Sequence, residues 1–215
     1  MTKHASEPSI PSLPAPIEFY FDFISPFGYF ASLRIDALAA AHGRAVEWRS
    51  MLLGVSVLKV MGLKPLLDTP LRGDYLRLDA ARYMRRHGIV VKRPIDRPPS
   101  NPLFAGRAFQ WLRAHRPDRA RQAAAALFAA YWVEDIALDD AEHVAEIAGL
   151  GVDLERRALL DGMMNGDGAT LLRREVDASL AQGVFGSPSF IVDGELFFGA
   201  DKLELLSEWL ASGGW

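Results

Sequence analysis

The sequence predicts an α/β protein in which a long helical segment interrupts one sheet. Three observations support this class: apolar strand-like runs lie near both ends of the chain, helical spacing fills the middle, and a hairpin signal occurs close to the C-terminus. The 215 residues are enough for one large domain, or for one domain inserted into another, and either can bury a sizeable core.

The first predicted unit has the order strand, helix, strand. Residues 17–23, IEFYFDF, form a short aromatic and apolar run that indicates a buried strand, although periodicity alone also allows a helix. Apolar residues recur at near-helical spacing over 26–42, with Pro26 at the favoured first position and Gly43 as a stop signal. Residues 45–52, AVEWRSML, predict a second strand, and the β-α-β order favours parallel pairing.

The middle of the chain predicts an inserted helical domain over residues 55–178. Its helical patterns are rich in Ala, Leu and Arg, and a proline-rich stretch interrupts them at 92–102. Pro117 and Asp118 form a turn signal between two helical segments, the second of which is apolar nearly all round, as in a helix buried within a bundle.

Strand character returns near the C-terminus. Two apolar runs are joined by Asp193-Gly194, the strongest short hairpin signal that a sequence offers, and a helical pattern follows over 200–210. A β-α-β half and a β-β-α half on one sheet form a thioredoxin-like layout, predicted to comprise residues 17–54 and 179–215. The Pro- and Ser-rich residues 1–16 predict a disordered leader rather than a signal peptide.

Composition narrows the possible partners and chemistry. The net charge of −3 gives no basic field for nucleic acid, and no segment is apolar and long enough to span a membrane, so we expect a cytoplasmic protein. The five histidines are scattered without metal-ligand spacing, so we expect no metal site. The chain contains no cysteine, so any sulfur chemistry requires a thiol that a ligand supplies.

Three local motifs are candidates for a binding site. Ser25 is predicted to be the N-cap of the first helix, where it either only caps the helix or also helps to hold a bound thiolate. Ser187-Pro188 precedes a strand; if its peptide bond is cis, the N–H and C=O of Ser187 point outward toward a peptide-like ligand. Asp201, after Gly199 and Ala200, is either a helix N-cap or the partner of a ligand ammonium group.

The segments FYFDFISPFGYFAS and GVFGSPSFIVDGELFFGADKLELL, with the helical block between them, resemble 2-hydroxychromene-2-carboxylate isomerases. These are relatives of kappa-class glutathione transferases and of the disulfide oxidoreductase DsbA, and the likeness covers nearly all of residues 17–210. The resemblance implies a thioredoxin-like fold with a large all-helical insertion. Because DsbA-like oxidoreductases keep a cysteine where this chain has Ser25, dithiol exchange by the chain itself is excluded.

The resemblance also implies a glutathione site. In this site, Ser25 contacts the glutathione sulfur, and the backbone of Ser187, the residue before Pro188, binds the tripeptide. The G-x-D segment also takes part in binding and corresponds to Gly199, Ala200 and Asp201. Two departures concern the pocket for the second substrate. Gly62-Leu63 stands where the family often has Gly-Asn, and Arg82-Tyr83 stands where it usually has Arg-Trp, whereas Asn101 matches a family Asn near that pocket.

The implied activity is glutathione-dependent cis-trans isomerisation of 2-hydroxychromene-2-carboxylate or a similar intermediate of aromatic catabolism. The expected partners are glutathione and a small aromatic keto acid, with a homodimer as a further expectation from the family. Two alternatives stay open: a kappa-type glutathione transferase or peroxidase, and a non-catalytic glutathione-binding module.

Overall fold

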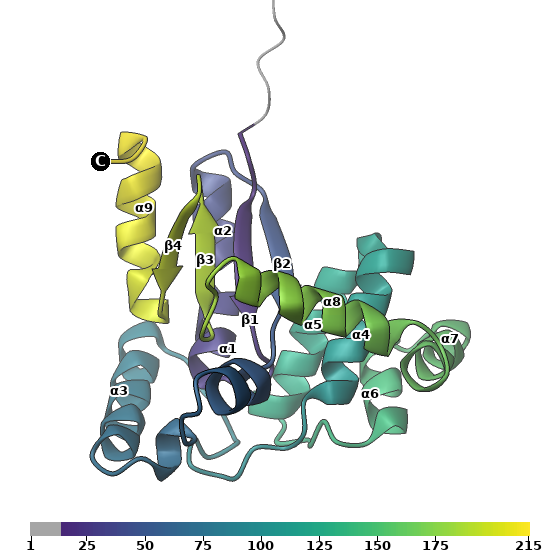
Figure 1. The fold of residues 1–215 in the computed structure, drawn as a ribbon. Coiled ribbons are helices and arrows are strands. Elements are labelled where there is room, and N and C mark those ends of the chain that lie inside the picture. The colour runs from purple at the N-terminus through teal and green to yellow at the C-terminus, as the bar shows by residue number, and fades with distance from the viewer. Residues whose placement is uncertain (1–13) are drawn as a thin grey trace, which may run out of the picture.

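A computed structural model describes residues 14–215, and its centre is a four-stranded mixed sheet (Figure 1). Residues 1–13 of the predicted leader lie outside this range. The strands, in the spatial order β2-β1-β3-β4, are β2 (Val46–Ser50), β1 (Ile17–Phe21), β3 (Ser189–Val192) and β4 (Glu195–Phe198). The β1–β2 pair is parallel, and the β1–β3 and β3–β4 pairs are antiparallel. This is the thioredoxin-like layout that the sequence predicts.

Helices cover the sheet and fill the connection between β2 and β3. Figure 1 shows α8 crossing in front of the sheet and α2 behind it. The helices are α1 (Pro26–Ser32), α2 (Ile35–Ala41), the π-helix η1 (Gly54–Val60), the 3-10 helix η2 (Leu66–Asp68), α3 (Arg72–His87), α4 (Leu103–His115), α5 (Pro117–Trp132), α6 (Ala141–Ala148), α7 (Asp153–Met164), α8 (Gly168–Ala181), the 3-10 helix η3 (Ala200–Lys202) and α9 (Leu203–Ser212). Within residues 14–215, no helix is both long and apolar enough to span a membrane.

The single helix predicted over 26–42 is wrong, because the structure divides it into α1 and α2 at Leu33 and Arg34. Leu33 contributed to the apolar pattern, yet its side chain is 53% exposed. The chain changes direction at this point, so one apolar stripe does not run along a single helix. The break lets the Arg34 guanidinium donate hydrogen bonds to Tyr83 Oη (2.8 Å) on α3 and Glu204 Oε1 (3.0 Å) on α9.

The hairpin prediction is confirmed. Asp193 and Gly194 both have positive φ angles, 52° and 90°, as the tight turns that match strand twist require. The Arg44 guanidinium donates a hydrogen bond of 2.6 Å to Asp193 Oδ1 and so attaches the turn to the chain before β2. The hairpin therefore aligns β3 and β4, so that the segment before β3 and the segment after β4 lie side by side at one end of the sheet.

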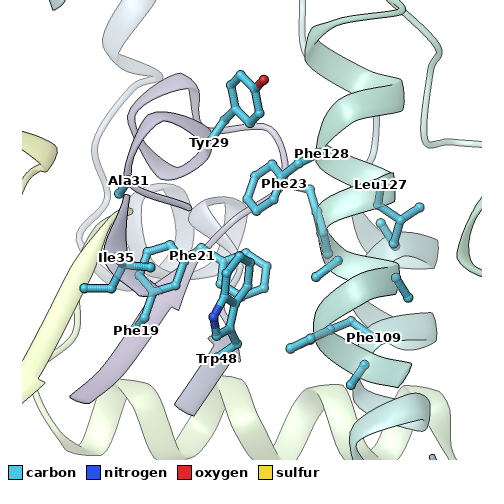
Figure 2. Close-up of a cluster of buried hydrophobic side chains, with 14 of the residues drawn as sticks. Phe19, Phe21, Phe23, Tyr29, Ala31, Ile35, Trp48, Phe109, Leu127 and Phe128 are labelled. Carbon is cyan, nitrogen blue, oxygen red and sulfur yellow. The ribbon is translucent and has the colours of Figure 1, made fainter. Parts of the chain in front are cut away.

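The main core is aromatic, and the sheet and the inserted helices share it (Figure 2). Phe21 of β1 is fully buried, and its ring centroid lies 5.2 Å from Phe109 of α4 and 5.3 Å from Phe128 of α5. Trp48 of β2 packs edge-on against Phe21 at 5.4 Å. Burying one such ring stabilises the fold by about 1.5–3 kcal/mol, so this cluster fastens the insertion to the sheet.

Ion pairs reinforce the same junction. The Glu175 carboxylate on α8 lies 3.1 Å from the Arg49 guanidinium of β2 and 3.0 Å from the Arg113 guanidinium of α4. The Glu175 side chain is only 12% exposed, so water screens these pairs less than it screens a surface pair.

Candidate active site

Ser25 lies at the end of the turn that leads from β1 into α1, and it caps the helix as predicted. Its backbone is extended (φ −86°, ψ 119°), and its Oγ accepts a hydrogen bond of 3.0 Å from the Gly28 N–H. The same hydroxyl donates a hydrogen bond of 2.9 Å to the carbonyl oxygen of Ser187. Ser25 is 4% exposed, so it serves both as a helix cap and as a bridge to the segment before β3.

The Ser187-Pro188 peptide bond is cis, and Ser187 faces Ser25. The expectation that both backbone groups of Ser187 point outward is only half right, because the carbonyl accepts the Ser25 hydroxyl. The Ser187 N–H has no acceptor within the described chain. The Ser187 side chain also holds the site together, since its Oγ accepts a hydrogen bond of 2.9 Å from the Asp22 N–H.

Gly28 permits this close approach between α1 and the Ser187 segment. A Cβ atom at Gly28 would lie 2.6 Å from Ser187 Oγ and 3.1 Å from Ser25 Cβ. A side chain at this position would therefore push the two serines apart.

The Gly199-Ala200-Asp201 segment joins the same group of residues. The Gly199 N–H donates a hydrogen bond of 3.0 Å to the Pro188 carbonyl oxygen. Gly199 has a φ of 112°, and a Cβ there would overlap Asp201 Oδ1. Asp201 does not cap the last helix: its carboxylate is 68% exposed and pairs with its neighbour Lys202 at 2.7 Å. The three sequence motifs are thus brought together, and the Asp201 carboxylate stays open to solvent.

Asp22 is a site residue that the sequence analysis missed. Its side chain is 1% exposed, and its carboxylate accepts hydrogen bonds from the N–H groups of Leu53 (2.8 Å) and Ile24 (3.2 Å). Burial raises the pKa of Asp22 from 3.8 to about 6, although these two hydrogen bonds oppose the shift. The signal was the acidic residue near the end of the run IEFYFDF, directly before Phe23; the strand ends at Phe21, so Asp22 begins the turn into the site.

Tyr83, which is predicted to contact the second substrate, connects three helices. Its hydroxyl accepts a hydrogen bond of 2.8 Å from Arg34 and lies 3.4 Å from the carbonyl oxygen of Ala200, to which it donates. Its ring stacks on Phe30 of α1 with centroids 5.4 Å apart. Tyr83 therefore holds α3 against α1 and η3.

The remaining predicted residues stand apart from this hydrogen-bonded group. Asn101 Oδ1 accepts a hydrogen bond of 3.1 Å from the Leu103 N–H, so its side chain closes the turn that begins α4. Gly62 has a φ of 65° after η1, and Leu63 is 45% exposed, with its N–H bonded to the Val57 carbonyl oxygen. In residues 14–215, no hydrogen bond links Asn101, Gly62 or Leu63 to Ser25 or Ser187.

The sheet topology, the helical insertion and the serine pair at the start of α1 define a thioredoxin-like protein without cysteine. The family model described as DSBA-like thioredoxin domain matches residues 16–211. The chain therefore belongs to the DSBA-like thioredoxin domain family.

Two curated relatives share a name. The chain is 27% identical to 2-hydroxychromene-2-carboxylate isomerase of Pseudomonas putida over 194 residues, which cover 88% of this chain and 91% of the relative. It is 26% identical to the protein of the same name from Sphingobium xenophagum over 197 residues, which cover 90% of this chain and 97% of the relative.

Solved structures confirm the fold. The structure of 2-hydroxychromene-2-carboxylate isomerase (HCCA isomerase) matches with a TM-score of 0.75 and 24% identity, covering 91% of this chain and 94% of that one. The cytosolic disulfide reductase DsbM from Pseudomonas aeruginosa, solved with GSH, matches with a TM-score of 0.63 and 15% identity over 92% of this chain and 96% of that one.

Proposed function

We propose that the chain is a glutathione-dependent cis-trans isomerase of 2-hydroxychromene-2-carboxylate or a similar aromatic keto acid. The observation that carries the proposal is the contact of Ser25 with Ser187 at the start of α1, in a chain without a thiol of its own. The names of the curated relatives support the reaction class. One neighbour of this fold, the disulfide reductase DsbM, was solved with GSH, which supports the choice of ligand.

The free polar groups of the site suit a peptide with a thiolate. The N–H of Phe27 in the first turn of α1 and the N–H of Ser187 have no acceptor in residues 14–215. An extended peptide lying along Ser187 would accept from the Ser187 N–H, as a neighbouring strand does. The first turn of α1 would offer the Phe27 N–H and the Ser25 hydroxyl to an anionic sulfur.

The hydroxyl of Ser25 has one proton, which the Ser187 carbonyl accepts in this structure. To stabilise a thiolate, Ser25 must turn this proton toward the sulfur, while its oxygen keeps the Gly28 N–H as a donor. The Ser187 carbonyl is then free to accept an N–H from the bound peptide. Binding would thus exchange one hydrogen bond within the protein for two to the ligand.

Bound glutathione supplies the sulfur nucleophile, whose reversible addition converts a double bond of the ring-opened keto acid into a rotatable single bond. Ser25 acts as a hydrogen-bond donor and not as the nucleophile, because within residues 14–215 its hydroxyl is hydrogen-bonded to Gly28 and Ser187 and to no basic side chain.

The direct test is a calorimetric titration with glutathione, followed by the absorbance assay of chromene isomerisation with and without glutathione. We expect binding, and isomerisation only when glutathione is present. A chlorinated aromatic and a hydroperoxide, assayed alongside, separate isomerase from transferase or peroxidase. Binding without turnover of any of these compounds would indicate a binding module, and the absence of binding would overturn the proposal.

A further inference from the structure

A pocket of about 430 Å³ lies between the far end of α1 and the C-terminal end of α3. This volume is within the range of small-molecule sites in proteins, about 300–1,000 Å³. Leu33 and Arg34 line the pocket where α1 ends, and Ile89 and Val90 line it from the chain that follows α3. Ser25 does not line it, and α1 separates Ser25 from Leu33 by roughly 10 Å along the helix axis. The pocket is therefore distinct from the candidate thiolate site.

A buried hydroxyl group faces this pocket. Tyr29 lines the pocket and is only 6% exposed, and its ring packs against Phe128 (centroids 5.8 Å apart) and lies nearly parallel to Trp132 (6.3 Å). Figure 2 shows its hydroxyl turned away from the other labelled rings. Burial raises the pKa of Tyr29, so the hydroxyl keeps its proton, and within the described chain no group accepts it. Because buried hydroxyls in proteins normally have partners, this one is available to a ligand.

The pocket lining carries a positive charge and no carboxylate among its described residues. The charge is that of Arg34, whose Nη1 donates to Tyr83 and whose Nη2 donates to Glu204, so that its Nε–H has no acceptor within residues 14–215. Glu204 is 45% exposed and lies outside the pocket lining, so it neutralises the guanidinium only weakly there. His87 adds no charge at pH 7, because burial and the nearby guanidinium groups lower its pKa below 6.5.

The end of α3 is compatible with an anion in the pocket. A helix C-terminus alone disfavours negative charge, because its last carbonyl groups carry partial negative charge. Here the N–H groups of Gly88 and Ile89 both donate to the Met84 carbonyl oxygen, and the last turn contains Arg85 and Arg86. These groups offset the helix dipole and leave Arg34 as the deciding charge.

The other walls of the pocket are apolar and partly open. Leu33 is 53% exposed and Val90 is 81% exposed, and Ile89 lies partly buried between the pocket and the core. A ligand with an apolar body would remove this surface from water, which favours binding. A doubly charged phosphate suits the pocket less well, because one guanidinium neutralises one charge and the apolar walls would stay uncovered.

We propose that this pocket binds a small monocarboxylate with an apolar body. Its carboxylate accepts from the Tyr29 hydroxyl and the Arg34 guanidinium, and its body covers Leu33 and Val90. The inference goes beyond the proposed function, because it assigns a second ligand site that contains neither Ser25 nor Ser187.

Benzoate is the probe, added to the whole chain without glutathione while the backbone amide signals are followed by NMR. We expect the largest shifts at Leu33, Ile89 and Val90, whose amides border the pocket. Benzyl alcohol keeps the ring without the charge and should bind about tenfold more weakly or worse. Acetate keeps the charge without the apolar body and should also bind more weakly than benzoate.

Tyr29→Phe tests the buried hydroxyl and keeps the ring that packs in the core. It should weaken benzoate binding about tenfold, as expected when a hydrogen bond to a charged group is lost. Tyr75→Phe is the matched control, because Tyr75 is 59% exposed on α3 and does not line the pocket. It should bind benzoate as tightly as the wild type does.

Val90→Glu tests the position of the ligand with little risk to folding, because Val90 is 81% exposed. The added carboxylate should repel benzoate and weaken its binding about tenfold or more, whereas benzyl alcohol should be much less affected. Val152→Glu adds the same charge at another exposed valine, outside the pocket, and should leave benzoate binding unchanged.

Three results would each overturn the proposal. They are equal affinity for benzoate and benzyl alcohol, equal effects of Val90→Glu and Val152→Glu, and amide shifts confined to Ser25 and Ser187. The last result would place the ligand at the candidate thiolate site. Since every measurement is made without glutathione, the outcome does not depend on whether the proposed function holds.

Discussion

Ser25 and Ser187 lie 162 positions apart in the chain, and the Ser25 hydroxyl donates a hydrogen bond of 2.9 Å to the Ser187 carbonyl oxygen. This contact joins the start of α1 to the segment that enters β3. It also occupies the only proton of the residue that is proposed to stabilise a thiolate. The same hydroxyl therefore supports the fold without ligand and would support the chemistry with it.

Ser25→Ala should lower the kcat of isomerisation by about 10²-fold or more, as expected when one preorganised donor is lost. It should also reduce the free energy of unfolding by about 1 kcal/mol, because the helix loses its N-cap. Activity assays and denaturant unfolding measure the two effects. Ser32→Ala is the control and should retain activity, because it removes a serine hydroxyl at the far end of α1 that donates to the Tyr29 carbonyl oxygen. A wild-type rate in Ser25→Ala would remove Ser25 from the mechanism.

Asp22 should make stability depend on pH. Its pKa is raised to about 6, so the folded protein binds a proton that the unfolded chain has released, and stability falls as pH rises from about 4 to 6. A shift of this size corresponds to a loss of about 3 kcal/mol in the free energy of unfolding by pH 7. Asp22→Asn should be less stable than wild type at pH 4, because one of the two N–H groups loses its acceptor, and the difference should shrink toward pH 7. Denaturant unfolding of both proteins between pH 4 and pH 7 measures this difference in stability. A difference that does not change with pH would contradict the prediction.

Gly28→Ala should damage the site by steric overlap alone. The added methyl group would lie 2.6 Å from Ser187 Oγ, which the Asp22 N–H holds in place, so the serine segment must move. We expect a loss of about 1–3 kcal/mol in the free energy of unfolding and weaker glutathione binding. Gly54→Ala is the matched control, because nothing lies within 4 Å of a Cβ at Gly54. Similar glutathione affinities in the two variants would show that the approach of α1 to Ser187 is not needed for binding.

Glu175→Gln should loosen the attachment of α8 to the sheet. The change removes the charge that two guanidinium groups share, those of Arg49 and Arg113, and leaves them partly buried. We expect a loss of about 1–3 kcal/mol in the free energy of unfolding, measured with denaturant. Glu208→Gln on α9 is the control, because Glu208 is exposed and forms no ion pair within residues 14–215. Equal stability of the two variants would mean that the aromatic core alone fastens the insertion.

The break between α1 and α2 could not be predicted from the sequence. The apolar spacing over 26–42 predicts one helix, yet the exposed Leu33 and the hydrogen bonds from Arg34 to α3 and α9 mark a break. Those partners lie 49 and 170 positions away, so no local pattern contains them. Tyr83 illustrates the same limit, since no local pattern contains the contacts of its hydroxyl with Arg34 and Ala200.

The sequence by itself determined the features that depend on short-range backbone chemistry. These are the cap at Ser25, the hairpin turn at Asp193-Gly194, the strand-helix order and the absence of a thiol. Only the tertiary structure decided that Ser25 donates to Ser187 and that the Asp22 carboxylate is buried. The reason is physical: a turn is set by the conformations open to a few neighbouring residues, whereas burial and hydrogen-bond partners are set by how the aromatic core packs distant segments together.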